Sequence, residues 1–161
     1  MNDPRQGDAG STGRIEALWI KRMRRGPMDP VERVSLVADA GIVGNANQKG
    51  KRQVTIIEQE TFDEIRRSLP DARPIMRRAN VMVSGLRLEG TRHHVLHLGG
   101  VRIQVWGETR PCERMDEQCH GLTTALDPHW RGGVYGTVLD DGEIAVGDVV
   151  SIEAPDHRLE E

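Results

Sequence analysis

Glycine and proline interrupt this sequence at short intervals along its whole length, and no other feature limits the possible folds as strongly. Eighteen glycines and eight prolines are spread through 161 residues, so the apolar runs between them stay short. Both residue types favour turns and end regular elements, and a chain divided in this way forms short strands more readily than long helices. We therefore predict a mostly β domain with a few helices.

The length suits a single domain with a substantial hydrophobic core. Aromatic residues make up only 3% of the sequence, so Val, Ile, Leu and Met must build most of that core. Residues 1–13 are polar and contain several glycines, and we interpret them as a disordered leader. Residues 14–153 form the predicted domain, and residues 154–161 a charged tail.

Composition also argues against several classes of partner. No apolar run approaches the length of a membrane span and the leader does not resemble a signal peptide, which predicts a cytoplasmic protein without a membrane partner. A formal net charge of −3, with a single Tyr and a single Phe for base stacking, argues against nucleic-acid binding. Basic clusters occur at residues 21–25, 49–52 and 73–78. Such clusters are usually solvated, although a phosphate-binding cleft would need only one or two of them.

Periodicity places several elements. Residues 14–21 have the residue types and alternation of a strand. Residues 60–69 carry apolar side chains at helical spacing, and Thr61 with Glu64 fits a capping box at the start of that helix. The Asp-Gly pair within residues 140–143 predicts a β-hairpin turn near the C-terminal end.

Cys112 is the residue best suited to chemistry. Residues 101–106 alternate like a half-buried strand that ends at Gly107, and Pro111 forces the backbone to leave the sheet just before the cysteine. Good helix formers follow, which would place Cys112 near a helix N-terminus, where the dipole favours a thiolate. A reactive or metal-ligating sulfur fits this position, and a small buried core residue is the structural alternative.

Neither the second cysteine nor the histidines add a site. If Cys112 and Cys119 lie in one helix, they are about 10 Å apart along its axis, too far for a disulfide. His93 and His97 would share one face of a strand about 13 Å apart, with His94 on the other face, so the three cannot close on one zinc ion.

Four segments share the order and spacing of a known family. They are Gly50–Val54, Arg78–Val81 with Ser84 and Gly85, Arg110–Cys112, and Arg131–Gly136 with Gly142 and Val146–Asp148. Each segment is weak alone. Together they make the sequence resemble, from about Arg14 to Glu153, the MOSC domain, which is named for the C-terminal part of molybdenum cofactor sulfurases.

The resemblance implies a MOSC-type β-barrel that holds a molybdenum-pterin cofactor, with Cys112 either ligating molybdenum or carrying a persulfide. It places Arg78 and Asn80 at the cofactor, where an arginine fork suits a phosphate and an amide suits pterin atoms. Further cofactor-binding candidates are Arg52, Arg110 and Arg131. A structural salt bridge is the alternative role for Arg52 and Arg131.

The resemblance also implies partners and an activity. Amidoxime-reducing members of the family point to the reduction of N-hydroxylated compounds with a redox partner, and the sulfurases point to a sulfur carrier with a sulfur-donor protein. Pyridoxal phosphate is not expected, because its lysine lies in a separate aminotransferase-like domain of full-length sulfurases. The chain has only three lysines and no such domain.

One departure from the family pattern leaves catalysis open. Many small bacterial relatives have Gly-Asp-x-His where this sequence has Gly44-Asn45-Ala46-Asn47. Two amides thus replace an acid and an imidazole, the residue types that supply general acid or base catalysis. Whether the chain is an enzyme therefore stays open, and a non-enzymatic binding or interaction module that retains the barrel is the alternative.

Overall fold

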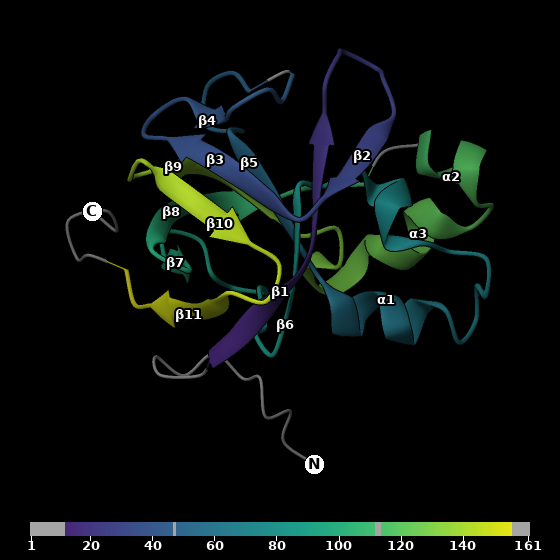
Figure 1. Ribbon diagram of the computed structural model, residues 1–161. Coiled ribbons are helices and arrows are strands. Elements are labelled where there is room, and N and C mark those ends of the chain that lie inside the picture. The colour runs from purple at the N-terminus through teal and green to yellow at the C-terminus, as the bar shows by residue number, and fades with distance from the viewer. Residues whose placement is uncertain (1–11, 47, 112–113, 156–161) are drawn as a thin grey trace.

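The computed structural model describes residues 12–46, 48–111 and 114–155 (Figure 1). Cys112, Asn47 and most of the predicted leader and tail lie outside the described residues. The predicted fold class is confirmed, because strands form a closed barrel and the helices lie together on one side of it. Among the helices of the described residues, none has the length and apolar character needed to cross a membrane.

Within the described residues, seven strands close the barrel in the order β11–β7–β8–β9–β5–β6–β1, and β1 pairs back to β11. Neighbouring strands are antiparallel except β5 and β6, and β2 extends the sheet beside β1. The strands are β1 (Thr12–Lys21), β2 (Met28–Val31), β5 (Val54–Glu58), β6 (Val81–Ser84), β7 (Val95–Leu98), β8 (Val101–Glu108), β9 (Val134–Val138) and β11 (Val149–Glu153).

A smaller sheet covers part of the barrel. It consists of β3 (Arg33–Val37), β4 (Gly41–Ile42) and β10 (Gly142–Ala145), in the order β10–β3–β4. Strand β3 alternates exposed and buried residues, and its buried side belongs to the same apolar cluster as the barrel interior. The buried residues of this cluster are all Val, Ile or Leu, which confirms the predicted aliphatic core.

A second apolar cluster joins the barrel to the helices. Phe62 and Ile65 of α1 pack there with Leu122 and Leu126 of α3, against side chains of β1 and β6 that include Trp19. The helical elements are α1 (Gln59–Ile65), α2 (Arg114–Gln118), α3 (Leu122–Leu126) and the 3-10 turns η1 (Pro74–Arg77) and η2 (Pro128–Trp130). This layer brings η1 and α2 close to each other on the helical side of the barrel.

The predicted hairpin at residues 140–143 is wrong. Strand β10 pairs with β3, not with β9, so the connection passes from the barrel to the smaller sheet. Neither Asp141 nor Gly142 has the positive φ that a type I′ turn requires. The acids instead bind elsewhere: Asp140 accepts three hydrogen bonds from Arg102, and Asp141 accepts one from the backbone N–H of Ala38.

The predicted helix at residues 60–69 exists, but its capping box does not. Strand β5 runs directly into α1, so Glu58 is the N-cap and Thr61 lies buried inside the helix. The helix ends at Ile65, earlier than the predicted end before Pro70. The apolar spacing is confirmed at Phe62 and Ile65, which are buried.

Strand β8 continues past Gly107 to Glu108, so the predicted end of this strand is wrong by a short distance. The register against β9 shifts between Val105 and Gly107. Gly107 has no side chain, which leaves room for Tyr135. A Cβ on Gly107 would lie 3.2 Å from the Tyr135 hydroxyl. The irregularity accommodates Tyr135 without ending the strand.

Candidate functional site

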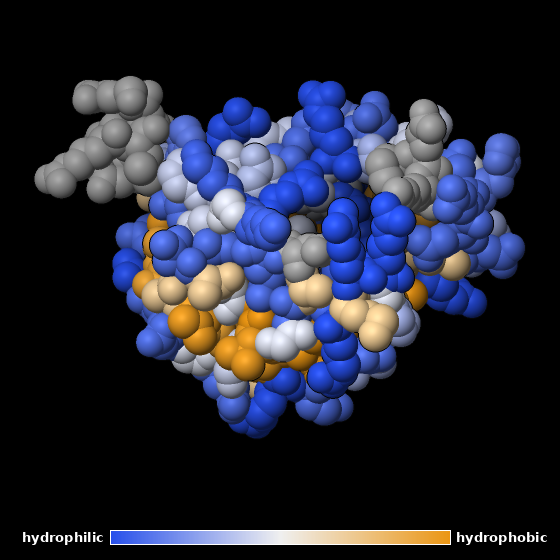
Figure 2. All heavy atoms as spheres, turned by 90° about the horizontal axis from the view of Figure 1, so that it is seen from above, coloured by the Kyte–Doolittle hydropathy of each residue, from blue (hydrophilic) through white to orange (hydrophobic). Residues whose placement is uncertain are grey.

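A cleft of about 910 Å³ opens between the β1–β2 hairpin, the segment after β4, η1, the end of β8 and α2. Its most evident property is charge. Six cationic side chains line it, whereas Glu117 is the only carboxylate among its described lining residues. Figure 2 looks down on the top of the molecule in Figure 1, where hydrophilic side chains predominate around a hollow. The six cations are Lys21, Arg24, Arg25, Arg52, Arg77 and Arg78.

Three of these cations, Lys21, Arg24 and Arg25, belong to the β1–β2 hairpin, and we call them the hairpin triad. Within the described part of the chain, no carboxylate lies within salt-bridge distance of any of them. Burial and, after it, the positive charges of Arg78 and Arg24 lower the pKa of Lys21 below its ordinary value. The hairpin triad thus concentrates three like charges without a carboxylate partner among the described residues.

Arg77 has a structural role in the cleft wall. Its side chain is 9% exposed, and its Nε and Nη2 donate to the backbone carbonyls of Gly132 and Thr109 at 2.9 and 3.2 Å. A Cβ on Gly132 would lie 2.3 Å from the Thr109 carbonyl oxygen, so only glycine permits this approach. Arg77 therefore fixes the end of β8 against the segment that precedes β9.

Arg78, a predicted cofactor residue, lines the cleft. Its backbone has a φ of 61°, the left-handed conformation that few non-glycine residues adopt. Its guanidinium donates to the carbonyl of Gly26 in the β1–β2 hairpin. The structure thus brings Arg78 next to the hairpin triad, although the two are far apart in sequence.

Asn80, the second predicted cofactor residue, also lines the cleft, but its side chain is 6% exposed and fully bonded. Its Oδ1 accepts from the backbone N–H and the hydroxyl of Thr55 at 3.1 and 3.2 Å. Its amide nitrogen donates to the Trp19 carbonyl and to Asn45 Oδ1 at 3.3 and 3.2 Å. An amide has two donor hydrogens and two acceptor sites, so Asn80 uses its full capacity to join β1, β5 and the segment after β4.

Asn45 is the described half of the Asn45/Asn47 departure, since Asn47 lies outside the described residues. Its Oδ1 accepts from the backbone N–H of Lys21 at 2.7 Å as well as from Asn80. A carboxylate could accept both bonds, but it would also bring a negative charge to Lys21. Asn45 therefore acts as an uncharged acceptor in the cleft wall.

The remaining predicted arginines occupy different places. Arg52 lines the cleft and its guanidinium lies 5.3 Å from the centre of the Tyr135 ring. Arg110 is 81% exposed, 3.6 Å from Glu108, and does not line the cleft. Arg131 also lies outside the lining and takes the alternative salt-bridge role, with Glu64 at 3.4 Å and the Ala125 carbonyl at 3.3 Å.

Cys112 lies outside the described residues, so its predicted position at a strand exit stays a prediction. On either side of it, Thr109 and Met115 both line the cleft. Thr109 is 5% exposed, and its Oγ1 is a buried oxygen without a hydrogen-bond partner in the described structure. Buried polar atoms are nearly always bonded, so this unbonded hydroxyl is unusual.

Sequence reasoning missed the hairpin triad and Thr109. The basic cluster at residues 21–25 was visible, but clusters of this kind usually face solvent. Nothing in the sequence shows that the same cleft receives residues from β8 and from the β1–β2 hairpin. The unbonded state of the Thr109 hydroxyl depends on packing and has no sequence signal.

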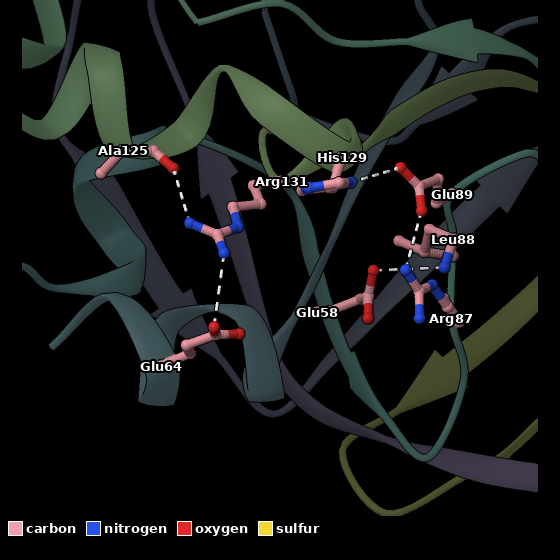
Figure 3. A network of polar contacts seen from close by, with 8 residues as sticks. All are labelled: Glu58, Glu64, Arg87, Leu88, Glu89, Ala125, His129 and Arg131. Carbon is pink, nitrogen blue, oxygen red and sulfur yellow. Dashed lines mark hydrogen bonds and ion pairs between the residues drawn. The ribbon is translucent and has the colours of Figure 1, made fainter. Parts of the chain in front are cut away.

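A second polar cluster contains arginines that are paired with carboxylates (Figure 3). We call it the η2 network, and it consists of Glu64, Arg87, Glu89, His129 and Arg131. Arg87 contacts Glu89 at 2.8 Å, and Glu89 contacts His129 at 3.2 Å. Arg87 and, after it, His129 lower the pKa of Glu89. Nearby, Arg131 and Glu64 form the ion pair described above, so each of these arginines has a carboxylate partner.

The histidines flagged by the sequence have separate contacts. His97 contacts Glu153 at 2.9 Å, and the ring of His93 packs edge-on against Trp106. Within the described ranges, no group of three or more His, Cys, Asp and Glu side chains is arranged to hold a metal ion.

Comparison with known proteins adds to this picture. The family model of the MOSC domain matches residues 33–151. The fold is similar to that of the YuaD protein from Bacillus subtilis, with a TM-score of 0.77 and 21% identity over 90% of this chain and 97% of that one. No curated protein matches the sequence.

Two further solved structures share the fold. For YiiM from Geobacillus stearothermophilus the TM-score is 0.68 and the identity 17%, over 87% of this chain and 74% of that one. For YiiM from Escherichia coli the values are 0.67 and 14%, over 89% and 71%. At such identities these similarities establish the fold alone.

Proposed function

The chain belongs to the MOSC domain family, and from this premise we propose that its cleft binds a molybdenum-pterin cofactor. The charge of the cleft is the main support. Six cations face a single carboxylate among the described lining residues, a composition suited to a ligand that carries a phosphate. Family membership suggests the class of cofactor, and the positive charge suggests that it binds in this cleft.

Side chains outside the hairpin triad also fit such a ligand. Arg52 and Arg78 would contribute cationic contacts from the cleft wall. Asn80 would act as a positioning residue, because its own bonds hold the wall together.

Cys112, Arg110 and Arg131 enter the proposal through the family pattern. Cys112 would either ligate molybdenum, for which a thiolate is a suitable soft ligand, or carry a persulfide. Arg110 is exposed, so it can contact a ligand without losing a buried bond. Arg131 would first have to leave Glu64 and the Ala125 carbonyl. When bound, the metal centre supplies redox chemistry, and a redox or sulfur-donor protein in the cytoplasm would be the partner.

One observation favours a second candidate, a binding module without catalysis. Asn45 occupies its place in the cleft wall as an uncharged acceptor, and its Oδ1 is already bonded to Lys21 and Asn80. An amide does not transfer protons at neutral pH. Such a protein would hold a phosphate-bearing ligand without reducing any substrate.

Cofactor content tests the proposed function. The protein is expressed in cells that make the molybdenum cofactor and in cells blocked in its synthesis, and bound molybdenum and pterin are measured in both. We expect both components only from the competent cells, in similar molar amounts. Equal content from the two strains, together with no labile sulfur on Cys112, would contradict the proposal.

A Cys112→Ser variant separates the two roles of the cysteine and the two candidate functions. If Cys112 ligates molybdenum, the variant retains pterin and metal, and the absorption spectrum of the metal centre changes. If it carries a persulfide, the variant loses labile sulfur at unchanged metal content. An unchanged phenotype and unchanged ligand binding would favour the binding module. Arg22→Gln is the matched control, since Arg22 pairs with Asp29 and does not line the cleft.

A further inference from the structure

The hairpin triad is a cluster of cations at one end of the cleft, without carboxylate partners among the described residues. Arg24 and Arg25 are exposed, Lys21 is half-buried, and all three line the cleft. Arg22, in the same hairpin, has a carboxylate partner in Asp29 at 3.0 Å. Within one hairpin, therefore, the arginine outside the cleft has a carboxylate partner, whereas Arg24 and Arg25 inside the cleft have none in the described structure.

Several contacts fix the hairpin at the cleft. The Gly26 N–H donates to the Met23 carbonyl at 2.9 Å, and the Gly26 carbonyl accepts from Arg78. On the other side, Lys21 is bonded through its N–H to Asn45 and through its carbonyl to the Ala46 N–H at 2.7 Å. The cations are thus presented by an anchored backbone.

Part of that backbone is held in an unfavourable conformation. Arg25 has a φ of 61°, the same left-handed value as Arg78, which lines the same cleft. Non-glycine residues adopt this conformation rarely, and such residues cluster at functional sites. The fold therefore accepts both backbone strain and charge repulsion at this end of the cleft, and a bound dianion would relieve the repulsion.

Asn45 brings no negative charge to Lys21, the member of the triad that it contacts. Its amide oxygen supports the Lys21 backbone without a charge, whereas a carboxylate there would act as a built-in counter-ion for Lys21. The part of the cleft at the hairpin triad thus suits an anion.

We propose that the hairpin triad binds the phosphate of a phosphate ester held in the cleft, and that Asn45 determines the strength of this anion site. The inference deepens the proposed function, since it assigns the phosphate of the ligand to named residues. The site itself recognises phosphate, which either inorganic phosphate or the cofactor's ester can supply.

Inorganic phosphate and pyrophosphate are the direct probes. They are titrated by calorimetry into the full chain, freed of cofactor by expression in the blocked cells, and into R24Q/R25Q, N45D and the control R22Q. We expect R24Q/R25Q to bind at least about tenfold more weakly, and N45D about threefold or more, because each change reduces the net positive charge. R22Q should bind like the wild type. Circular dichroism confirms that each variant is folded.

Cofactor content of the same variants, from competent cells, separates this inference from the proposed function. If the wild type contains no cofactor but its phosphate binding depends on the triad, the proposed function is wrong and the anion site is supported. If the wild type contains cofactor and R24Q/R25Q contains as much, the triad is not the phosphate site and the proposed function is supported. Absence of phosphate and pyrophosphate binding at millimolar concentration would also overturn the anion site.

Discussion

The cleft and the η2 network both gather arginines, but they differ in how those charges are compensated. In the η2 network each arginine contacts a carboxylate, and Glu89 links Arg87 to His129. In the cleft, the hairpin triad has no carboxylate within salt-bridge distance in the described structure. Paired surface charges contribute modestly to stability, whereas unpaired clustered charges oppose it. This difference supports our proposal that the η2 network serves the fold and the hairpin triad a ligand.

Arg77 provides the largest expected effect, because it is a cleft cation with a structural role. R77M would leave the Gly132 and Thr109 carbonyls without their buried donor. We expect a loss of about 3 kcal/mol in the free energy of unfolding, since each hydrogen bond from a charged group contributes about 1.5–3 kcal/mol. Urea denaturation measures it. The control is R110M, at an exposed site, and equal losses in the two variants would contradict the structural role.

Lys21 provides the next effect, in the pH dependence of phosphate affinity. Its pKa is lowered by burial, Arg78 and Arg24, so it loses its proton at a lower pH than an ordinary lysine. Phosphate binds the protonated form, and affinity should fall by up to about tenfold as pH rises through this pKa, at a lower pH than an ordinary lysine would cause. In K21R the arginine stays charged, so the fall should be absent. The same fall in both proteins would exclude Lys21 as its cause.

Glu89 tests the paired region. E89Q removes the carboxylate shared by Arg87 and His129, and we expect a loss of about 0.5–1 kcal/mol in unfolding free energy at neutral pH. Arg87 and then His129 lower the pKa of Glu89, so its contribution is present at neutral pH and disappears as pH falls through that lowered value, below 4.5. The stability of E89Q should fall less over that acid range. A change in phosphate affinity would show that the two regions are not independent.

The smallest expected effect is on stability in the hairpin triad. R24Q/R25Q should change the free energy of unfolding by no more than about 0.5 kcal/mol, because both side chains are exposed and without carboxylate partners in the described chain. Urea denaturation without phosphate measures this. A loss comparable to that of R77M would mean that the triad supports the fold, and the contrast between the two regions would disappear.

The fold was largely predictable because its signals are local. Alternation predicts strands such as β8, and apolar spacing predicts α1 with Phe62 and Ile65 buried. Aliphatic composition predicts the aliphatic core. The failed hairpin at Asp141 and Gly142 had a local signal too, but long-range contacts override it, because Asp140 binds Arg102 and β10 pairs with β3.

The candidate site was less predictable, because it depends on which distant segments meet. The family pattern indicated Arg78 and Asn80, and both line the cleft. It could not distinguish a residue that faces a ligand from one such as Asn80, whose bonding capacity is filled by its neighbours. The triad is recognisable only when Lys21, Arg24 and Arg25 are seen to lack carboxylate partners among the described residues, which requires the positions of the neighbouring acids.

A native mass spectrum of the protein purified from cofactor-competent cells is the decisive test of cofactor binding. We expect a complex heavier than the chain by the mass of a molybdenum-pterin cofactor, and a loss of that complex in R24Q/R25Q but not in R22Q. A spectrum that shows the bare chain alone, with neither a bound pterin nor a persulfide on Cys112, would contradict it.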